Sequence, residues 1–197
     1  IMAATDRKIQ GIDRYKDYLK TPDGREDGTA YLELGWLYLD ANLWRQATDA
    51  LARAQKYSPQ NPDIDMALAR AYQKNERMPE ALAAAQSAIQ KQPRRAEFRD
   101  TMADLYLAAG EQEKACDEAR LAIKVTRDAL QKSAIDLDSL RKLSKYYDTY
   151  RRALNASLAT SKIPTAIRID LAKAIAEHAK LSRTITLSEA LQVLQEI

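Results

Sequence analysis

Residues that could do chemistry are few in this 197-residue sequence, which contains one histidine, one cysteine and five glycines. His178 has only Ala174 and Ser182 four residues away, so no histidine pair forms at the helical spacing that zinc sites use. Cys116 follows Ala115 in an apolar helical pattern, which is typical of a core cysteine, and it has no second cysteine for an internal disulfide. We therefore predict no metal site and no thiol chemistry.

Other catalytic arrangements are also missing from the sequence. Gly28 and Gly35 belong to a helical repeat and not to a glycine-rich phosphate loop. Aspartate and glutamate are numerous, but we place them on solvated helix faces, where nothing desolvates them. The sequence thus predicts a protein that is not an enzyme and that uses no cofactor.

The charge distribution limits the classes of partner that the protein could bind. The 31 basic and 28 acidic side chains give a net charge of +3, so charge is nearly balanced. The basic clusters at 91–95 and 141–152 are interleaved with Asp100, Asp138 and Asp148, which indicates solvated helix faces and not a nucleic-acid surface. No run approaches the roughly 18 apolar residues of a membrane span. We expect no nucleic acid and no membrane span.

The elements that would position any site are amphipathic helices, and the clearest pair lies in residues 28–61. Apolar and small residues recur there at spacings of three and four, first over 31–38 and then over 47–54. Residues 40–42 separate the two patterns, a gap short enough to make the helices antiparallel, and Pro59 ends the second. No alternation of β-branched residues appears, so we predict an all-α protein.

This helix pair repeats with a period of 34 residues. The small residue Gly35 aligns with Ala69 and Ala103, and the remaining recurrent positions are Tyr38, Tyr72 and Tyr106, Ala47, Ala81 and Ala115, and Ala54, Ala88 and Ala122. The pattern resembles the tetratricopeptide repeat (TPR) family, closely over residues 28–129. The resemblance implies an α-solenoid of three TPR hairpins, at 28–61, 62–95 and 96–129, with turns near Asn42, Asn75 and Gly110. The aligned tyrosines and alanines should be buried between helices.

Flanking segments complete the predicted domain organisation. Residues 1–27 contain a helix over 5–20, with Ile9, Ile12, Tyr15, Tyr18 and Leu19 on one side. It is either the second helix of an incomplete repeat or a capping helix. Residues 130–197 form a C-terminal helical bundle, including a helix from Pro164 and a last helix that Thr186 to Glu189 would cap. Because Ile1 precedes Met2, we interpret the sequence as part of a longer chain.

A long helix is predicted over residues 136–160. A capping box at Ser133 to Asp136 favours a break before it, and one unbroken helix over 111–160 is the alternative. Its apolar stripe comprises Leu140, Leu143, Tyr147, Tyr150 and Leu154. Two heptads are short for a coiled coil, so the stripe either packs within the chain or forms a homodimer seam.

The resemblance also implies where a partner would bind, because first helices of TPR units line a concave groove. Carried onto this sequence, the groove residues are Leu32, Trp36, Leu39, Asp40, Met66, Arg70, Gln73, Lys74, Asp100 and Asp104. This groove would be apolar at one end, basic in the middle and acidic at the far end. The lysine and asparagine that clamp a peptide carboxylate in some family members are missing. Leu32, Trp36, Leu39 and Met66 would form an exposed apolar patch, unless helix 5–20 or an upstream repeat covers it.

We therefore expect a protein–protein interaction module, an adaptor or assembly segment that binds a peptide or helix of another protein. Trp36 and Leu32 would anchor the partner, and Arg70 with Lys74 would select an acidic stretch. A structural role, with self-association through helix 136–160, is the alternative. The partner and the compartment stay undetermined. The cytoplasm is slightly favoured, although a targeting signal could be missing from the sequence.

Overall fold

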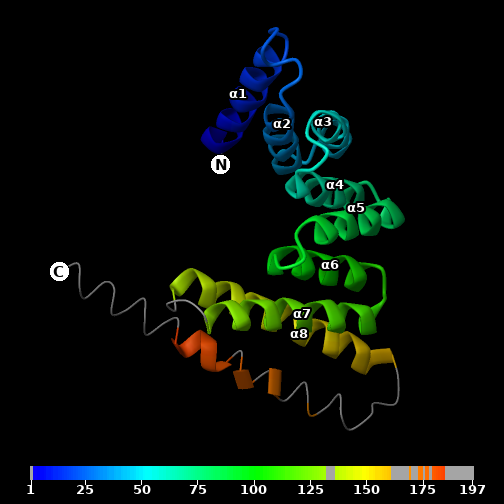
Figure 1. The fold of residues 1–197 in the computed structure, drawn as a ribbon, viewed down its shortest axis with the longest axis vertical. Coiled ribbons are helices and arrows are strands. Elements are labelled where there is room, and N and C mark those ends of the chain that lie inside the picture. Colours follow the sequence, from blue (N-terminus) through cyan, green and yellow to red (C-terminus); the bar gives the residue numbers. More distant parts are fainter. Residues whose placement is uncertain are drawn as a thin grey trace, which may run out of the picture. The chain divides into compact units, whose positions relative to one another are not determined.

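The computed structural model describes residues 2–131, 136–160, 169, 173–174, 176–177 and 179–184. Regular structure in this part of the chain is entirely helical, as predicted (Figure 1). The helices are α1 (Met2–Tyr18), α2 (Gly28–Asp40), α3 (Trp44–Tyr57), α4 (Pro62–Lys74), α5 (Met78–Lys91), α6 (Ala96–Ala108), α7 (Gln112–Leu130) and α8 (Leu137–Thr160).

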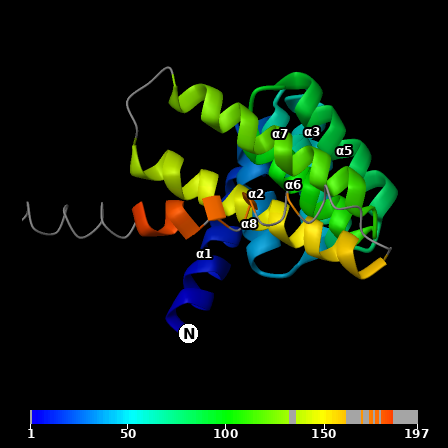
Figure 2. The ribbon, with the colours of Figure 1, turned by 90° about the horizontal axis from the view of Figure 1, so that it is seen from below.

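The chain divides into two compact units, Ile1–Pro93 and Arg94–Ile197. The first unit holds α1 to α5, and the core of α2, α3 and α4 centres on Leu51, Ile64 and Leu68. The second unit holds α6, α7 and α8, whose core is built from alanines of α7 and aromatic residues of α8. Helices α7 and α8 run alongside each other in Figures 1 and 2.

Helix hairpins α2–α3, α4–α5 and α6–α7 close with the same turn, and the predicted turn positions are confirmed. The left-handed residues are Asn42, Glu76 and Gly110, with φ of 59°, 60° and 77°. In the first turn the amide N–H of Leu43 donates to the carbonyl of Tyr38 at 2.9 Å, and that of Asn42 donates to Leu39 at 3.1 Å. These are the two bonds of a Schellman motif, which satisfies carbonyls at a helix end.

The first helices of the three hairpins differ in whether a side chain caps their N-terminus. The Asp27 carboxylate accepts from the backbone N–H groups of Thr29 and Ala30, and the Asn61 side chain accepts from that of Asp63. At the aligned position Arg95 offers no side-chain cap to α6. A side-chain cap is worth about 1 kcal/mol, so α6 starts without a contribution that α2 and α4 have.

Small residues bring the helices of each hairpin together. Ala47, Ala81 and Ala115 are fully buried, as predicted. A Cβ on Gly35 would lie 2.5 Å from Cδ2 of Leu51, so only glycine permits this approach.

The prediction that the aligned tyrosines are buried between helices is corrected, because Tyr38, Tyr72 and Tyr106 are only partly buried. The Arg77 guanidinium lies 4.6 Å from the Tyr72 ring centroid, and the Lys114 ammonium lies 5.4 Å from that of Tyr106. These two rings therefore lie at the hairpin edge beneath a cation of the following turn or helix, and not wholly inside it.

Helix α1 packs on α2 with part of the predicted face, namely Ile12, Tyr15 and the following Leu19, and it begins at Met2 instead of residue 5. Ile12 is buried, whereas Ile9 and Tyr18 are 52% and 40% exposed. A Cβ on Gly11 would lie 3.3 Å from Cδ1 of Leu37, so α1 approaches α2 closely at that point. The contact with α2 uses a narrower stripe than the apolar pattern indicates.

Residues 111–160 contain two helices, α7 and α8, and not one unbroken helix. The predicted break before the long helix is therefore confirmed. Helix α7 ends at Leu130, and Asp136 caps α8 by accepting from the backbone N–H of Ser139 at 2.8 Å. Outside the described residues lie Ser133 of the predicted capping box, the helix-face residues Ile167, Leu171, Ile175 and His178, and the final helix from Thr186. The predictions for these residues stay predictions.

The prediction that acidic side chains are all solvated is wrong for Asp65, which is fully buried. Its carboxylate accepts hydrogen bonds from the Gln55 amide at 2.9 Å and the Ser87 hydroxyl at 2.8 Å, and it is paired with Lys91. A buried carboxylate is tolerated when such partners replace water. This one joins α3, α4 and α5.

Candidate partner-binding face

In the first unit the predicted groove residues lie on α2 and α4, which are neighbouring helices. The predicted exposed apolar patch is wrong, because Leu32, Leu39 and Met66 are 6%, 9% and 4% exposed. Leu32 and Leu39 belong to the core that α2 forms with α3 and α4. The following repeat therefore contributes to covering these residues. Neither α1 alone nor an upstream repeat is needed to explain their burial.

The side chains that do reach the surface are basic and aromatic. Trp36 is half-buried, and the Arg70 guanidinium lies 5.3 Å from its ring centroid. Gln73 is also half-buried, while Arg70, Lys74 and Asp40 are exposed. We call this set, Asp40, Trp36, Arg70, Gln73 and Lys74, the Trp36 face.

Arg70 and Lys74 are the charged groups of this face that a partner could use. Within the described parts of the chain neither forms an ion pair with a carboxylate, and the Lys74 ammonium lies 5.6 Å from the ring centroid of Trp44. A guanidinium stacked on an aromatic ring keeps its N–H edge for a carboxylate. The face can therefore offer an apolar contact and two cations together.

The second unit uses its predicted groove acids internally. Lys142 pairs with Glu97 at 3.2 Å, Lys145 with Asp100 at 2.8 Å, and Arg152 with Asp104 at 2.9 Å. Asp100 is fully buried, so the predicted acidic end of the groove is not a surface open to a partner. The physical reason is that α8 packs against α6 and supplies these three cations.

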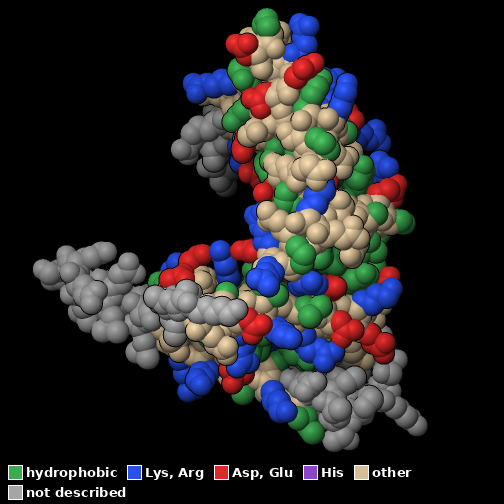
Figure 3. Space-filling model, in the orientation of Figure 1, with side chains coloured by type: hydrophobic (Ala, Val, Ile, Leu, Met, Phe, Trp, Pro, Cys, Tyr) green, Lys and Arg blue, Asp and Glu red, His purple; other side chains and the backbone are tan. Residues whose placement is uncertain are grey.

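Hydrogen bonds between charged side chains at the contact of α8 with α6 shift the pKa values of these groups. The pKa of Lys142 lies above its ordinary value because its ammonium donates to Asp138 and then to Glu97. The pKa of Asp148 is lowered, first by the hydrogen bond from Arg151. Basic and acidic side chains are accordingly intermingled over the face of the second unit that Figure 3 shows, and no continuous basic area appears there.

Catalytic groups do not gather in the described part of the chain. It contains no group of three or more His, Cys, Asp or Glu placed to hold a metal ion. Cys116 is buried with Sγ 4.0 Å from Oγ of Ser157, and burial raises the pKa of its thiol. A raised pKa makes the reactive thiolate scarcer. Among the helices described above, none combines the length and apolarity needed to cross a bilayer.

Comparison with known families agrees with this architecture. Residues 38–105 match a family model described as tetratricopeptide repeat. This part of the chain is therefore similar to the tetratricopeptide-repeat family, whose scaffolds are typically non-catalytic. No curated protein matches the sequence.

Solved structures with the same fold include particular TPR proteins. A crystal structure of MamA is 18% identical with a TM-score of 0.61, covering 92% of this chain and 90% of that one. TTC0263, a thermophilic TPR protein of Thermus thermophilus, is 19% identical with a TM-score of 0.55, covering 89% and 94%. The TPR2B domain of yeast Sti1, in a complex with pHsp70, is 23% identical with a TM-score of 0.52, covering 61% and 90%. At these identities the likeness concerns the fold.

Proposed function

We propose that this chain is a non-catalytic protein–protein interaction module that binds an acidic peptide or helix of another protein on the Trp36 face. The observation that carries the proposal is the stacking of Arg70 on a half-buried Trp36, with Lys74 one turn further along α4. Tryptophan and arginine are the residues that most often dominate binding energy at interfaces. The TPR2B domain of Sti1, which has the same fold, is solved in a complex with pHsp70.

Recognition would divide between two kinds of contact. The Trp36 ring gives a partner's apolar side chain a surface that is already held in place by the Arg70 guanidinium. Arg70 and Lys74 then attract carboxylates of the same partner, which raises the association rate and excludes basic segments. Leu32 is not an anchor in this proposal, because its side chain lies in the core.

Intrinsic fluorescence can test the proposal because the chain has only two tryptophans, Trp36 and Trp44. In a Trp44→Phe background, Trp36 becomes the sole indole reporter. The probes are a synthetic peptide of glutamate and leucine at helical spacing and its lysine counterpart. We expect saturable changes with the acidic peptide only. Binding of both peptides alike would contradict the selection of acidic partners.

Substitutions separate the two contributions. Trp36→Ala should weaken binding of the acidic peptide by about 2 kcal/mol or more, with little dependence on salt. Arg70→Ala and Lys74→Ala should each cost about 1 kcal/mol or less, and their effect should shrink as salt rises. Calorimetry measures all three, since the first variant lacks the reporter. If none of the three changes affinity, the Trp36 face is not the binding surface.

A further inference from the structure

A cavity of about 340 Å³ opens between α1, α2 and α3, on the other side of α2 from the Trp36 face. Tyr31, Leu34 and Tyr38 of α2 line it, and they share one helix face because their spacings are three and four residues. Trp36 is five residues from Tyr31, which places it about 140° around the helix. The cavity is therefore separate from the site proposed above.

The floor of the cavity is apolar and ordered. Leu34 and Ala50 are buried, and the Tyr31 ring stacks on that of Tyr57 with centroids 5.8 Å apart. Leu19, from the segment after α1, adds a third aliphatic side chain to the lining. A volume of this size lies within the range of about 300 to 1,000 Å³ that small-molecule pockets occupy.

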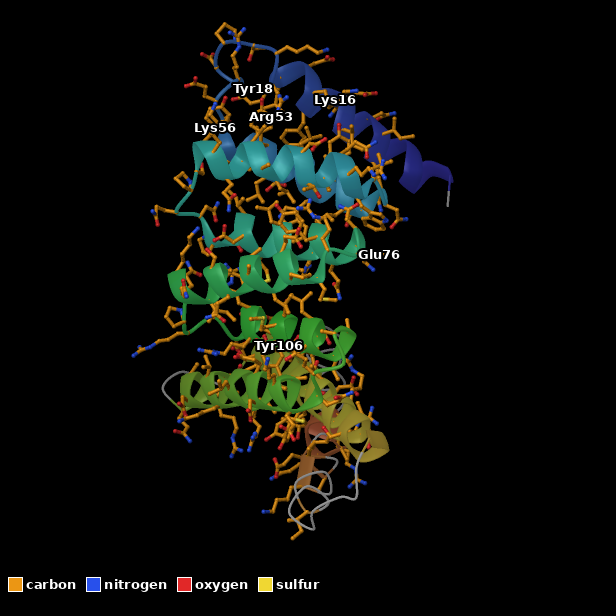
Figure 4. All side chains as sticks on the ribbon, turned by 90° about the vertical axis from the view of Figure 1, so that its right-hand side faces the viewer. Lys16, Tyr18, Arg53, Lys56, Glu76 and Tyr106 are labelled. Carbon is orange, nitrogen blue, oxygen red and sulfur yellow. The ribbon has the colours of Figure 1, made fainter. Side chains whose placement is uncertain are left out.

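Three cations border this apolar floor, against one acidic side chain, Asp49. Lys16 comes from the last turn of α1, Lys20 from the segment after it, and Arg53 from α3; Figure 4 labels Lys16 and Arg53 on their helices. The Arg53 guanidinium donates to the Tyr31 hydroxyl at 3.5 Å and lies 5.8 Å from the ring centroid. Its hydrogen-bond partner among the described residues is thus a neutral group, which leaves its charge for a ligand.

The two lysines form only exposed ion pairs with aspartates of α1. Lys20 lies 2.7 Å from Asp17 and Lys16 lies 3.8 Å from Asp13, and all four side chains are at least half exposed. Exposed ion pairs of this kind are weak because water screens both charges, so the ammonium groups can turn to a bound anion at small cost. The aspartates of both pairs lie outside the cavity lining.

Several contacts hold the cavity walls in place. The Lys8 ammonium donates to the Asp40 carbonyl at 3.0 Å, and the Tyr18 hydroxyl donates to the Asp27 carboxylate at 3.2 Å. In the connector, a Cβ on Gly24 would lie 2.1 Å from the carbonyl oxygen of Tyr18, so the chain closes tightly beneath α1. Little reordering is needed before a ligand enters, which favours binding.

We propose that this cavity is a second binding site, for a small amphiphilic anion with one acidic head group on a short apolar body. The apolar floor would receive the body of the ligand. Arg53, Lys20 and Lys16 would receive the head group, which replaces their contacts with water and with exposed carboxylates. The excess of cations over acids in the lining is the feature that selects an anion.

Octanoate is the probe for this proposal, with octylammonium and acetate as matched ligands that change only the charge or the apolar body. Chemical-shift mapping of backbone amides should show saturable shifts with octanoate, centred on the lining segments of α1, α2 and α3. Octylammonium should bind about tenfold more weakly or not at all, because its charge is repelled. Acetate should give no saturable shift.

Variants identify the groups responsible. Arg53→Gln should weaken octanoate binding about tenfold, and Lys20→Gln, a change at an exposed side chain outside the core, should weaken it severalfold. Lys56→Gln is the control on the same helix: its ammonium lies 5.4 Å from the Tyr57 ring centroid and it does not line the cavity (Figure 4). It should leave affinity unchanged.

Three results would overturn the proposal. The first is equal binding of octanoate and octylammonium, which would reduce the cavity to an apolar hollow. The second is unchanged octanoate affinity in both Arg53→Gln and Lys20→Gln. The third is a shift pattern centred on Trp36 that is lost in Trp36→Ala. Because acidic-peptide binding to the Trp36 face is measured separately, failure at this cavity leaves that function intact.

Discussion

Left-handed backbone at the three hairpin turns is carried by different residue types. Asparagine occupies position 42, glutamate position 76 and glycine position 110, all with positive φ. A side chain at such a position costs about 1 kcal/mol or more, and asparagine tolerates it better than most. Glu76 is exposed and lies at the tip of the α4–α5 hairpin (Figure 4), so the strain there is not offset by burial.

Exchanging these residues should move stability in opposite directions. Glu76→Gly should raise the free energy of unfolding by about 0.5–1 kcal/mol, and Gly110→Ala should lower it by about 1 kcal/mol. A Cβ at Gly110 meets no atom within 4 Å, so the loss would come from φ alone. Urea unfolding measures both. Glu76→Gln, which keeps the strained backbone, is the control; a less stable Glu76→Gly would contradict the argument.

The hydroxyl of Tyr146 is the second feature at this scale. The side chain is 1% exposed, and its oxygen has no hydrogen-bond partner among the described residues. Burial raises the pKa of this phenol, and the nearby carboxylates of Glu97 and Asp100 raise it further. An unpartnered buried hydroxyl carries a desolvation cost of about 1–3 kcal/mol, so this residue is destabilising relative to phenylalanine.

Tyr146→Phe should therefore be as stable as the parent or more stable at neutral pH, and less sensitive to alkali. The unfolded phenol ionises near pH 10, while the folded one resists ionisation because its pKa is raised. Ionisation of this phenol therefore leaves stability unchanged below about pH 10 and lowers it as pH rises above that value, because the unfolded state then loses the proton first. Denaturant unfolding between pH 7 and 11 should show a shallower decline for the variant, and an unchanged decline would contradict this.

Packing at the scale of helices depends on small residues at fixed repeat positions. Ala81, Ala85 and Ala88 of α5 are fully buried, whereas Ala83 on the same helix is exposed. Interiors packed in this way have no room for extra methylene groups. The alternation of buried and exposed alanines along one helix provides a matched comparison.

Ala81→Leu should overpack the α4–α5 contact and lower the free energy of unfolding by about 1–3 kcal/mol. Ala83→Leu makes the same change at an exposed site and should stay within about 0.5 kcal/mol of the parent. Thermal unfolding measured in parallel gives both values. Equal effects of the two substitutions would mean that the assigned helix register is wrong.

At the scale of the whole molecule, the question is whether α8 is free to join two chains. Its residues Leu143, Tyr147, Tyr150 and Leu154 are buried inside the second unit, and Leu140 is partly buried. The same helix provides the cations that pair with α6. The stripe from which a dimer seam would be built is therefore already covered by its own chain.

We expect the purified protein to sediment as a monomer at micromolar concentration. Sedimentation velocity over a hundredfold concentration range tests this, because a self-associating chain shows a sedimentation coefficient that rises with concentration. Lys142→Glu, which places like charge opposite Glu97, should lower stability without changing the mass. A dimer that Lys142→Glu dissociates would favour the structural role of α8 over the interaction module.

The sequence by itself determined the helices, the hairpin turns and the small core positions. These features are local or strictly periodic: a 3.6-residue apolar pattern marks a helix, and a 34-residue recurrence marks its partner. Asn42 and Gly110 at turns, and Ala47, Ala81 and Ala115 in the core, could be read in this way. The choice of Trp36, Arg70 and Lys74 as groove residues came from the family resemblance, and their role stays a proposal.

Only the tertiary structure decided which helix covers each face. Leu32 and Leu39 look like an exposed patch in the sequence, but neighbouring helices bury them. Asp100 looks like a groove acid, but α8 covers it and supplies Lys145. Neither outcome follows from periodicity, because a helix pattern gives the direction of a side chain and not the residue that meets it. The position of α1, which makes the cavity beside Arg53, depends on contacts of the same long-range kind.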